Sequence, residues 1–424
     1  MKLFYNDINL EVYNIFLAAG VDCLDEIELT SEDSNYYYYI DYGSTFTNSP
    51  LNYFNRNFND FKSPTDYDLI RETKAKLNIP ELVYQKLSTG HARLIIDFSK
   101  EGHYHPDWYH THKLFNMPEE NLVWITGDKF INETKDPRSK YSFTFMSFWE
   151  SAVANHFTND GPARTFRANH KLFTPTALKY VRDLIVNKKV KKYHNIFYNR
   201  RPRTYRIELL VQFYHNKMLD DMIWSWGGFN FDDVFNKLDQ VYVSNLHKKF
   251  GDEYKASIDT VLSWDQLKNY KKQVVSEELV LDDLSLEDVS DTYYRLVTET
   301  YTIDKNMFLT EKTYKSMLLY QPFVIWGSPY SIKTLREDGY KTFDKWIDHS
   351  YDSIENFNDR RDALVSEVRR LNSISKEEWA EMCFEMLPHL DYNYKHLMNY
   401  ASRYSIDNNF QIKYKCNDLI RKGR

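Results

Sequence analysis

The chain has 424 residues, of which 42% are hydrophobic and 27% are charged, and these values predict a soluble globular protein of two domains, or three. Its formal net charge of −6 excludes a general electrostatic attraction to nucleic acid, so a nucleic-acid partner is not favoured. The three cysteines, Cys23, Cys383 and Cys416, lie far apart without metal-binding spacing, which is typical of a reducing compartment.

The beginning of the sequence predicts a cytoplasmic protein. Residues 1–16 carry acidic residues and asparagines among their apolar positions, so they lack the pattern of a signal peptide. No apolar run elsewhere approaches the length of a membrane span. We therefore expect no membrane-spanning segment.

The N-terminal half alternates predicted strands and helices. Strands are predicted at Lys2–Tyr5, at the tyrosine-rich run Tyr36–Tyr42 and at the apolar runs Ala92–Asp97 and Leu122–Thr126. The tyrosine-rich run is interpreted as an ordinary amphipathic strand. Helical stretches between these strands make the pattern typical of a parallel sheet.

Two carboxylates follow the strand at Ala92–Asp97. Asp97 ends that strand, and Glu101 lies on the loop after it. Ligands of open parallel sheets bind at the carboxyl ends of the strands, so both are candidate functional residues. A solvated loop carboxylate is an equally good interpretation of Glu101.

The next ten residues, His103–His112, contain four histidines and one aspartate. Their spacing matches neither a zinc finger nor a helical H-E-x-x-H site, and Pro106 prevents one helix from aligning them. We therefore predict no metal site, and the histidines are candidates for lining a ligand cleft beside Glu101.

A strongly basic segment opens the second half of the chain. Residues 188–206 contain eight lysines and arginines and no acidic residue. Ile196–Tyr198 is a predicted strand and Tyr205–Asn216 an amphipathic helix. Several arginines at the start of a helix could clamp a diphosphate, because free N–H groups there favour anions. A solvated basic face or a nucleic-acid patch is the alternative. The clamp would consist of Arg200, Arg201 and Arg203 in the turn Asn199–Arg203, and Ser225 lies near the end of the next predicted strand.

The most informative stretch runs from residue 295 to 343. It predicts a buried strand at Arg295–Glu299, an N-cap at Thr310 and a helix at Glu311–Tyr320. A second strand at Phe323–Trp326 and a helix at Ser331–Glu337 follow. This order of strand, helix, strand and helix again builds a parallel sheet.

Carboxylates and lysines gather at the expected carboxyl edge of that sheet. Glu299 ends a strand, and Glu311, Lys312 and Lys315 lie in the first turns of a helix. The lysines suit phosphates, whereas the carboxylates suit hydroxyl groups, so the combination favours a nucleotide sugar as the ligand. A merely favourable first helical turn is the alternative interpretation.

These residues resemble the donor-site signature of the α-1,3-fucosyltransferases and of a looser fucosyltransferase-like group of microbial and viral proteins. The similarity lies in Glu299, in Phe308–Lys312 and in Pro322–Gly327, and it extends over roughly residues 199–371. Phe308 followed by Leu309, and Trp326 in the second strand, depart from the pattern of that family and leave the sugar open.

The resemblance implies an α/β protein with two Rossmann-like domains facing a cleft, the GT-B glycosyltransferase architecture. Residues 1–188 would form the acceptor-side domain, residues 189–371 the donor-binding domain, and residues 372–424 helices that pack back on the first domain, with a basic tail. The reaction would move a sugar from a GDP- or UDP-linked donor to a carbohydrate or other hydroxyl acceptor by metal-independent displacement, without a cofactor. Glu101, or in second place Asp97, would deprotonate the acceptor. The donor-binding residues would be Asn199, Arg200, Arg201, Arg203, Ser225, Glu299, Thr310, Glu311, Lys312 and Lys315.

Two other classes of function stay open at this point. One is a non-catalytic virion, assembly or sugar-binding protein on the same scaffold. The other is a phage enzyme that glycosylates nucleic-acid bases, which the acidic net charge disfavours.

Overall fold

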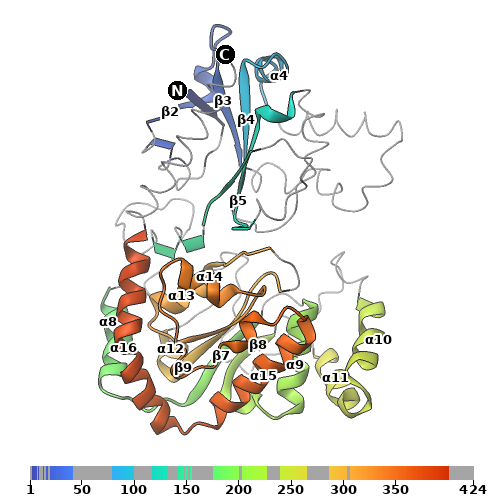
Figure 1. Cartoon of the computed structure of the whole chain (residues 1–424), viewed down its shortest axis with the longest axis vertical. Helices are drawn as coiled ribbons and strands as arrows, with labels where there is room; N and C mark the ends of the chain where they lie inside the picture. Colours follow the sequence, from blue (N-terminus) through green and yellow to red (C-terminus); the bar gives the residue numbers. More distant parts are fainter. Residues whose placement is uncertain are drawn as a thin grey trace. The chain divides into compact units, whose positions relative to one another are not determined.

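The chain divides into two compact units, each built on a parallel β-sheet (Figure 1). Unit 1 comprises Met1–Ala152, Lys305–Phe308 and Tyr400–Arg424, and unit 2 comprises Val153–Asp304 and Leu309–Asn399. The computed structural model describes residues 2–6, 8, 13, 16–17, 20–41, 79–99, 117–130, 142–147, 149–150, 153–154, 175–199, 203–226, 239–264, 286–302 and 306–400. The protein therefore has the expected α/β class.

The sheet of unit 1 has six parallel strands in the order β2-β1-β3-β4-β5-β6. Its strands are β1 (Lys2–Tyr5), β2 (Asp22–Asp25), β3 (Tyr36–Asp41), β4 (Ala92–Phe98), β5 (Leu122–Thr126) and β6 (Ser142–Phe145). Strand order reverses between β1 and β3, as in doubly wound folds, and this reversal places the preferred ligand edge at the carboxyl ends of those strands.

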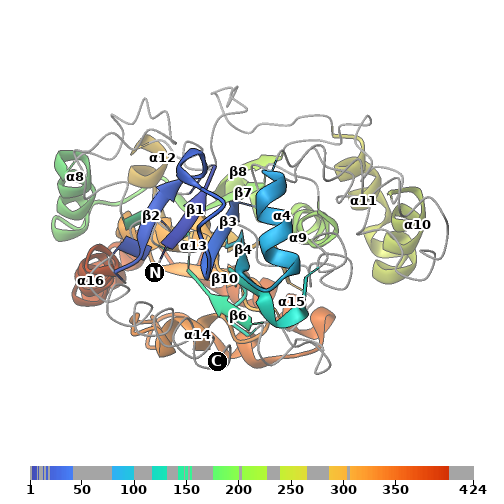
Figure 2. The ribbon, with the colours of Figure 1, turned by 90° about the horizontal axis from the view of Figure 1, so that it is seen from above.

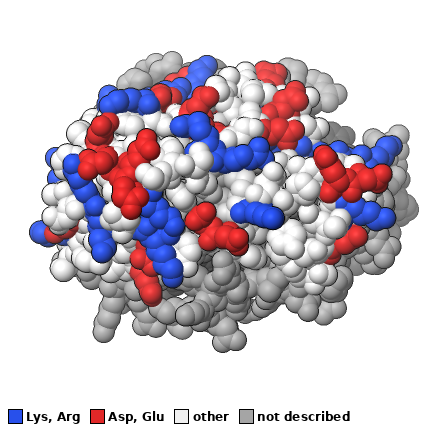
Figure 3. All heavy atoms as spheres, turned by 90° about the horizontal axis from the view of Figure 1, so that it is seen from below, with Lys and Arg blue, Asp and Glu red and all other residues white. Residues whose placement is uncertain are grey.

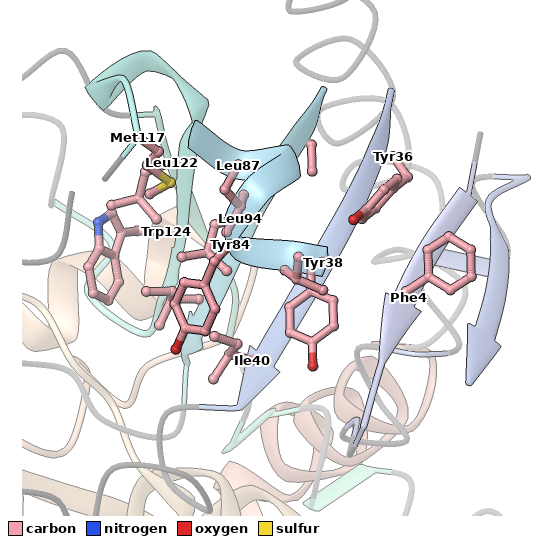
Figure 4. Packing of buried hydrophobic residues seen from close by; sticks show 13 residues of the cluster. Phe4, Tyr36, Tyr38, Ile40, Tyr84, Leu87, Leu94, Met117, Leu122 and Trp124 are labelled. Atoms are coloured by element: carbon pink, nitrogen blue, oxygen red, sulfur yellow. The ribbon is translucent and has the colours of Figure 1, made fainter. Parts of the chain in front are cut away.

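Both faces of this sheet are buried. Helix α4 (Glu81–Ser88) packs Val83, Tyr84 and Leu87 against one face of β3, β4 and β5 (Figure 4). The opposite face carries a second apolar cluster. Tyr36, Tyr37, Tyr38 and Tyr39 are each at most 2% exposed. The prediction of an amphipathic strand was therefore wrong, because β3 is an inner strand of a parallel sheet with both faces covered.

The sheet of unit 2 has four parallel strands in the order β10-β9-β7-β8. They are β7 (Tyr193–Asn199), β8 (Met222–Trp226), β9 (Thr292–Thr298) and β10 (Phe323–Trp326). Order again reverses, here between β7 and β9, so the carboxyl ends of β7 and β9 form the preferred ligand edge of this sheet.

Helices cover both faces of the second sheet. One layer consists of α9 (Thr204–His215), α11 (Lys255–Leu262) and α15 (Phe357–Ser373), with α10 (Asp239–Phe250) beside α11. The other layer consists of α8 (Pro175–Val186), α12 (Leu286–Asp291), α13 (Glu311–Leu318) and α16 (Lys376–Met398). Figure 2 shows α8 beside α16, and α10 beside α11. The short helix α14 (Ser331–Glu337) follows β10.

Unit boundaries differ from the predicted domain boundaries at both ends of unit 2. Helix α8 was placed in the first domain, but it contacts α12 and α16 and belongs to unit 2. Helix α16 was expected to pack back on the first domain, but it contacts α8 and α13 within unit 2. Its long apolar face is therefore used inside unit 2.

Local signals placed several elements of unit 2 correctly. Thr310 caps α13 by accepting a hydrogen bond from the Lys312 N–H, and Gly339 has the positive φ of 88° expected after a helix. Helix α15 begins at Phe357, although the apolar spacing of Tyr351–Leu371 predicts a helix from Tyr351, because Asn356 accepts hydrogen bonds from the N–H groups of the first helical turn. A short 3-10 helix, Ser350–Ser353, precedes it.

Lys191, just before β7, is an unusual buried lysine of unit 2, and it predicts a pH dependence. Its Nζ donates to the carbonyl oxygens of Val289 and Thr292, at 3.2 and 2.7 Å, and burial lowers the pKa of Lys191 from 10.5 to about 8. Between these two pH values the unfolded chain binds more protons than the folded chain, so stability rises with pH.

We expect Lys191→Met to remove that rise. The free energy of unfolding of the variant should exceed that of wild type most at pH 7. This difference should shrink by about 2–3 kcal/mol as the pH approaches 10.5. Urea denaturation across this range measures it. Lys192→Met, at an exposed neighbour, should keep the wild-type slope. If the free energies of unfolding of wild type and Lys191→Met changed with pH in parallel, the lowered pKa of Lys191 would be contradicted.

None of the helices in the described part of the chain is long and apolar enough to cross a membrane.

Candidate functional site

Polar side chains line the carboxyl edge of the unit 2 sheet. Backbone register pairs Trp326 with Thr298 and Asn199 with Trp226, so the last residues of the four strands form one row. Within this row the Thr298 hydroxyl donates to Asn199 Oδ1 at 2.9 Å, across the switch point between β7 and β9. Asn199 is 1% exposed, and its Nδ2 has no hydrogen-bond acceptor among the described residues. A ligand at this edge would therefore meet an available donor.

Glu299 follows β9 directly and fixes the start of α13. Its fully buried carboxylate accepts hydrogen bonds from the Thr310 N–H at 2.9 Å, the Thr310 hydroxyl at 2.6 Å and the Thr313 hydroxyl at 2.6 Å. Both carboxylate oxygens are thus occupied by the protein. The structure brings Glu299 and Thr310 together as predicted, but it gives Glu299 a positioning role.

Glu311 and Lys312 form the first turn of α13. Glu311 is 1% exposed, and its Oε1 accepts no hydrogen bond from any described residue. Lys312 Nζ lies 3.4 Å from that oxygen, 4.0 Å from Glu299 Oε2 and 2.9 Å from the Thr310 hydroxyl. Lys315 is also buried, one turn further along the helix. A buried carboxylate oxygen without a donor is costly, so this position favours a ligand that carries hydroxyl groups.

The first turn of α9 approaches the same edge from the other layer. Arg206 donates to the Thr298 carbonyl at 3.2 Å, and Arg203 donates to the Thr300 carbonyl at 3.1 Å. The Tyr205 hydroxyl donates to the carbonyls of Glu299 and Thr300. These bonds hold the segment after β9. Arg203 was expected to bind a diphosphate, and in the structure its guanidinium donates to the Thr300 carbonyl instead.

Burial dominates the electrostatics of this turn. It lowers the pKa of Arg206 and raises the pKa of Tyr205. Glu299 and Glu311 partly oppose the shift at Arg206 because their negative charges favour the guanidinium. Arg206 and Tyr205 were missed by sequence reasoning. The only available signal was their place in the basic segment at the start of a predicted helix.

Three other donor-site predictions have different outcomes. Arg200 and Arg201 lie outside the described residues, between β7 and α9. Ser225 is the penultimate residue of β8, and its hydroxyl accepts a hydrogen bond from the Asn199 N–H at 3.3 Å. The predicted serine therefore reaches the site by supporting Asn199.

A second helix start at this edge, that of α14, is already occupied. The Asp352 carboxylate accepts hydrogen bonds from the N–H groups of Ile332 and Lys333 at 2.9 and 3.0 Å. This carboxylate supplies the negative charge that a helix N-terminus favours. An anionic ligand is therefore not expected at α14.

At the carboxyl edge of the unit 1 sheet, Asp97 is buried near the end of β4. It accepts hydrogen bonds from the Tyr39 hydroxyl at 2.6 Å and from the Ser99 N–H at 2.9 Å. Ser99 is fully buried, and its own hydroxyl has no partner among the described residues. Glu101 and the histidines of His103–His112 lie outside the described residues.

A distant segment joins this edge of unit 1. The Asp128 carboxylate accepts a hydrogen bond from the Met307 N–H at 2.9 Å, and the Lys129 N–H donates to the Met307 carbonyl at 2.9 Å. A Cβ on Gly127 would lie 2.6 Å from Phe308 Cε2 and from the Ser99 carbonyl, so glycine permits this approach. The chain thus passes through unit 1 just before it begins α13 in unit 2.

Metal-ligand groups and surface charge bear on the chemistry only where the structure describes the residues, which leaves His103–His112 outside. Within the described ranges, no group of three or more histidine, cysteine, aspartate or glutamate residues could hold a metal ion. On the face drawn in Figure 3, the described acidic and basic side chains are interspersed. The described residues of that face therefore form no continuous basic surface of the kind that binds a nucleic-acid backbone.

In comparisons with known proteins, no family model, no curated protein and no solved structure matches the chain. A functional proposal for this protein therefore rests on the geometry described above.

Proposed function

We propose that the protein is a glycosyltransferase that binds a nucleotide-diphosphate sugar at the carboxyl edge of the unit 2 sheet. The observation that carries the proposal is the pair of Glu311 and Lys312. Glu311 Oε1 is buried and accepts no hydrogen bond from a described residue, and it forms an ion pair of 3.4 Å with Lys312 Nζ near the switch point of the sheet. A nucleotide sugar would suit both side chains, since its hydroxyls would donate to the carboxylate and its phosphates would attract the lysine.

Other residues of this edge support the same ligand. Asn199 Nδ2 can donate to a sugar, ribose or phosphate oxygen. Glu299 and Thr310 hold α13 in place, and Arg203, together with Arg200 and Arg201, would add positive charge at the start of α9. In this proposal GDP- and UDP-linked sugars, fucose among them, are the donor class.

The chemical step we propose is a direct displacement at the sugar. A general base removes the proton of the acceptor hydroxyl, the hydroxyl oxygen forms the new glycosidic bond, and the bond to the diphosphate breaks. The two hydrogen bonds already accepted by Asp97 favour Glu101 as that base. Lysine and arginine side chains would stabilise the departing diphosphate without a metal. The two parallel sheets are compatible with the GT-B architecture, and we propose that architecture together with the activity.

A thermal-shift panel of GDP, UDP and their sugars tests the donor site. A ligand specific to the folded state stabilises it by about 2.7 kcal/mol at one hundred times its Kd, so we expect a higher melting temperature with at least one of them. Transfer to an acceptor should survive EDTA. No shift with any nucleotide at millimolar concentration would contradict the proposal. Binding without hydrolysis or transfer would favour a non-catalytic sugar-binding protein.

A further inference from the structure

A buried arginine of unit 2 forms no ion pair with any acidic residue that the structure describes. Arg360, in the first turns of α15, is 2% exposed. Its Nη1 donates to the carbonyls of Ile354 and Glu355, at 2.7 and 3.1 Å, and its Nη2 donates to the carbonyl of Thr302. A guanidinium has five N–H groups, and Nε makes no hydrogen bond with any described residue. Neutral carbonyls therefore surround a full positive charge.

Two neighbours of Arg360 also carry polar groups without partners. The guanidinium carbon lies 5.2 Å from the centre of the Trp326 ring, and Trp326 Nε1 is buried without an acceptor. The Thr302 hydroxyl is buried without a partner as well, on the residue whose carbonyl binds Arg360. Trp326 and Thr302 are at most 1% exposed. Within the described part of the chain, Arg360 and two residues that it contacts, Trp326 and Thr302, thus each carry a buried polar group without a hydrogen-bond partner.

The described acidic group that acts electrostatically on Arg360, Asp352, is already engaged. Asp352 influences Arg360 electrostatically, but its two oxygens accept the N–H groups of Ile332 and Lys333, and it lies beyond ion-pair distance of Arg360. Burial accordingly lowers the pKa of Arg360 to about 10. A buried charge without a counter-charge is strongly destabilising, and buried indole and hydroxyl groups in proteins normally have partners.

We propose that Arg360, Trp326 Nε1 and the Thr302 hydroxyl form an enclosed binding site for a small phosphate-type anion. Water could satisfy the two N–H donors, but it would leave the positive charge uncompensated, whereas an anion satisfies both. The site lies at the end of β10 and against α15, and it uses neither Glu311 nor Lys312. It therefore stands independently of the proposed nucleotide-sugar site.

The experiment measures binding of inorganic phosphate to the full chain by calorimetry and by thermal shift, at constant ionic strength. Chloride is the second anion, and GDP is added separately to distinguish free phosphate from a phosphoryl group. Trp326→Phe removes the indole donor and keeps an aromatic ring, and Arg360→Met removes the charge. Arg369→Met, at an exposed arginine of the same helix, is the matched control.

We expect saturable stabilisation of wild type and of Arg369→Met by phosphate. Trp326→Phe should bind about tenfold more weakly, since it loses one hydrogen bond to an anion, and Arg360→Met should not bind. If Arg360→Met does not fold, Trp326→Phe alone decides. Equal phosphate affinity in wild type and Trp326→Phe, or no saturable effect in wild type, would overturn the proposal and leave water as the occupant. Phosphate binding that persists while GDP does not bind would separate this site from the nucleotide-sugar proposal.

Discussion

Replacing Glu299 with alanine is expected to lower the free energy of unfolding of unit 2 by about 3–5 kcal/mol. The substitution removes the acceptor of three hydrogen bonds, from the Thr310 N–H and from the hydroxyls of Thr310 and Thr313. These donors are buried with Glu299 and would be left without water or protein partners. The start of α13 should therefore loosen, and urea denaturation measures the loss.

Glu337→Ala provides the matched control. Glu337 lies on the short helix α14 and forms an exposed i,i+4 pair with Lys333 at 3.9 Å. Exposed pairs of this kind contribute about 0.3–0.5 kcal/mol, so its removal should hardly change the urea midpoint. If Glu299→Ala were as mild as Glu337→Ala, the three short hydrogen bonds could not be what fixes α13.

Much of unit 2 near this site could be predicted because its signals are local. Thr310 before a helical run predicts the cap of α13, and Pro322 predicts the end of that helix before β10. The bounds of β10 and α14 agree with the prediction, since Pro322 and the turn at residues 327–329 delimit β10 and Gly339 follows the end of α14. Gathering Glu299, Thr310 and Glu311 at one edge follows from the βαβ order alone.

Other features depend on contacts distant in sequence. Nothing in the tyrosines of β3 distinguishes a half-buried strand from an inner strand, because that depends on the helices that cover the sheet. The parallel strand Asp22–Asp25 was not predicted, since its sequence carries two aspartates and only one large apolar residue. Passage of residues 305–308 through unit 1 follows from the pairing of Asp128 with Met307, which lie 179 positions apart.

The sequence predicted which residue types lie at the site, but it did not predict the hydrogen-bond partners of each side chain. Sequence spacing placed two glutamates at the edge, but only the hydrogen bonds distinguish Glu299, whose oxygens are both occupied, from Glu311, which keeps a buried oxygen without a donor. Similarly, the basic segment indicated a phosphate clamp, whereas Arg203 and Arg206 bind backbone carbonyls. Arginine side chains have several donors, so their partners cannot be assigned from sequence.

Lys312→Ala is expected to weaken binding of a nucleotide-diphosphate sugar by about tenfold to a hundredfold. The reason is that one charge-assisted contact to a partly buried phosphate contributes roughly 1.5–3 kcal/mol. Lys312 is suited to this contact, because its side chain keeps 24% of its surface exposed while Thr310, Glu299 and Glu311 orient it. Calorimetry on the full chain measures the change. Lys333→Ala, at a 63% exposed lysine of α14, should bind like wild type.

Glu101→Gln completes this test because it separates binding from chemistry. If Glu101 is the base, the variant should bind the donor with unchanged affinity, while transfer falls at least about a hundredfold, since glutamine cannot accept the proton of the acceptor hydroxyl. Donor affinity of Lys312→Ala equal to that of wild type would remove the lysine from the site and weaken the whole assignment. Full transfer by Glu101→Gln would instead leave the donor site intact and move the search for the base to Asp97, where the hydrogen bonds from Tyr39 and Ser99 must first be broken.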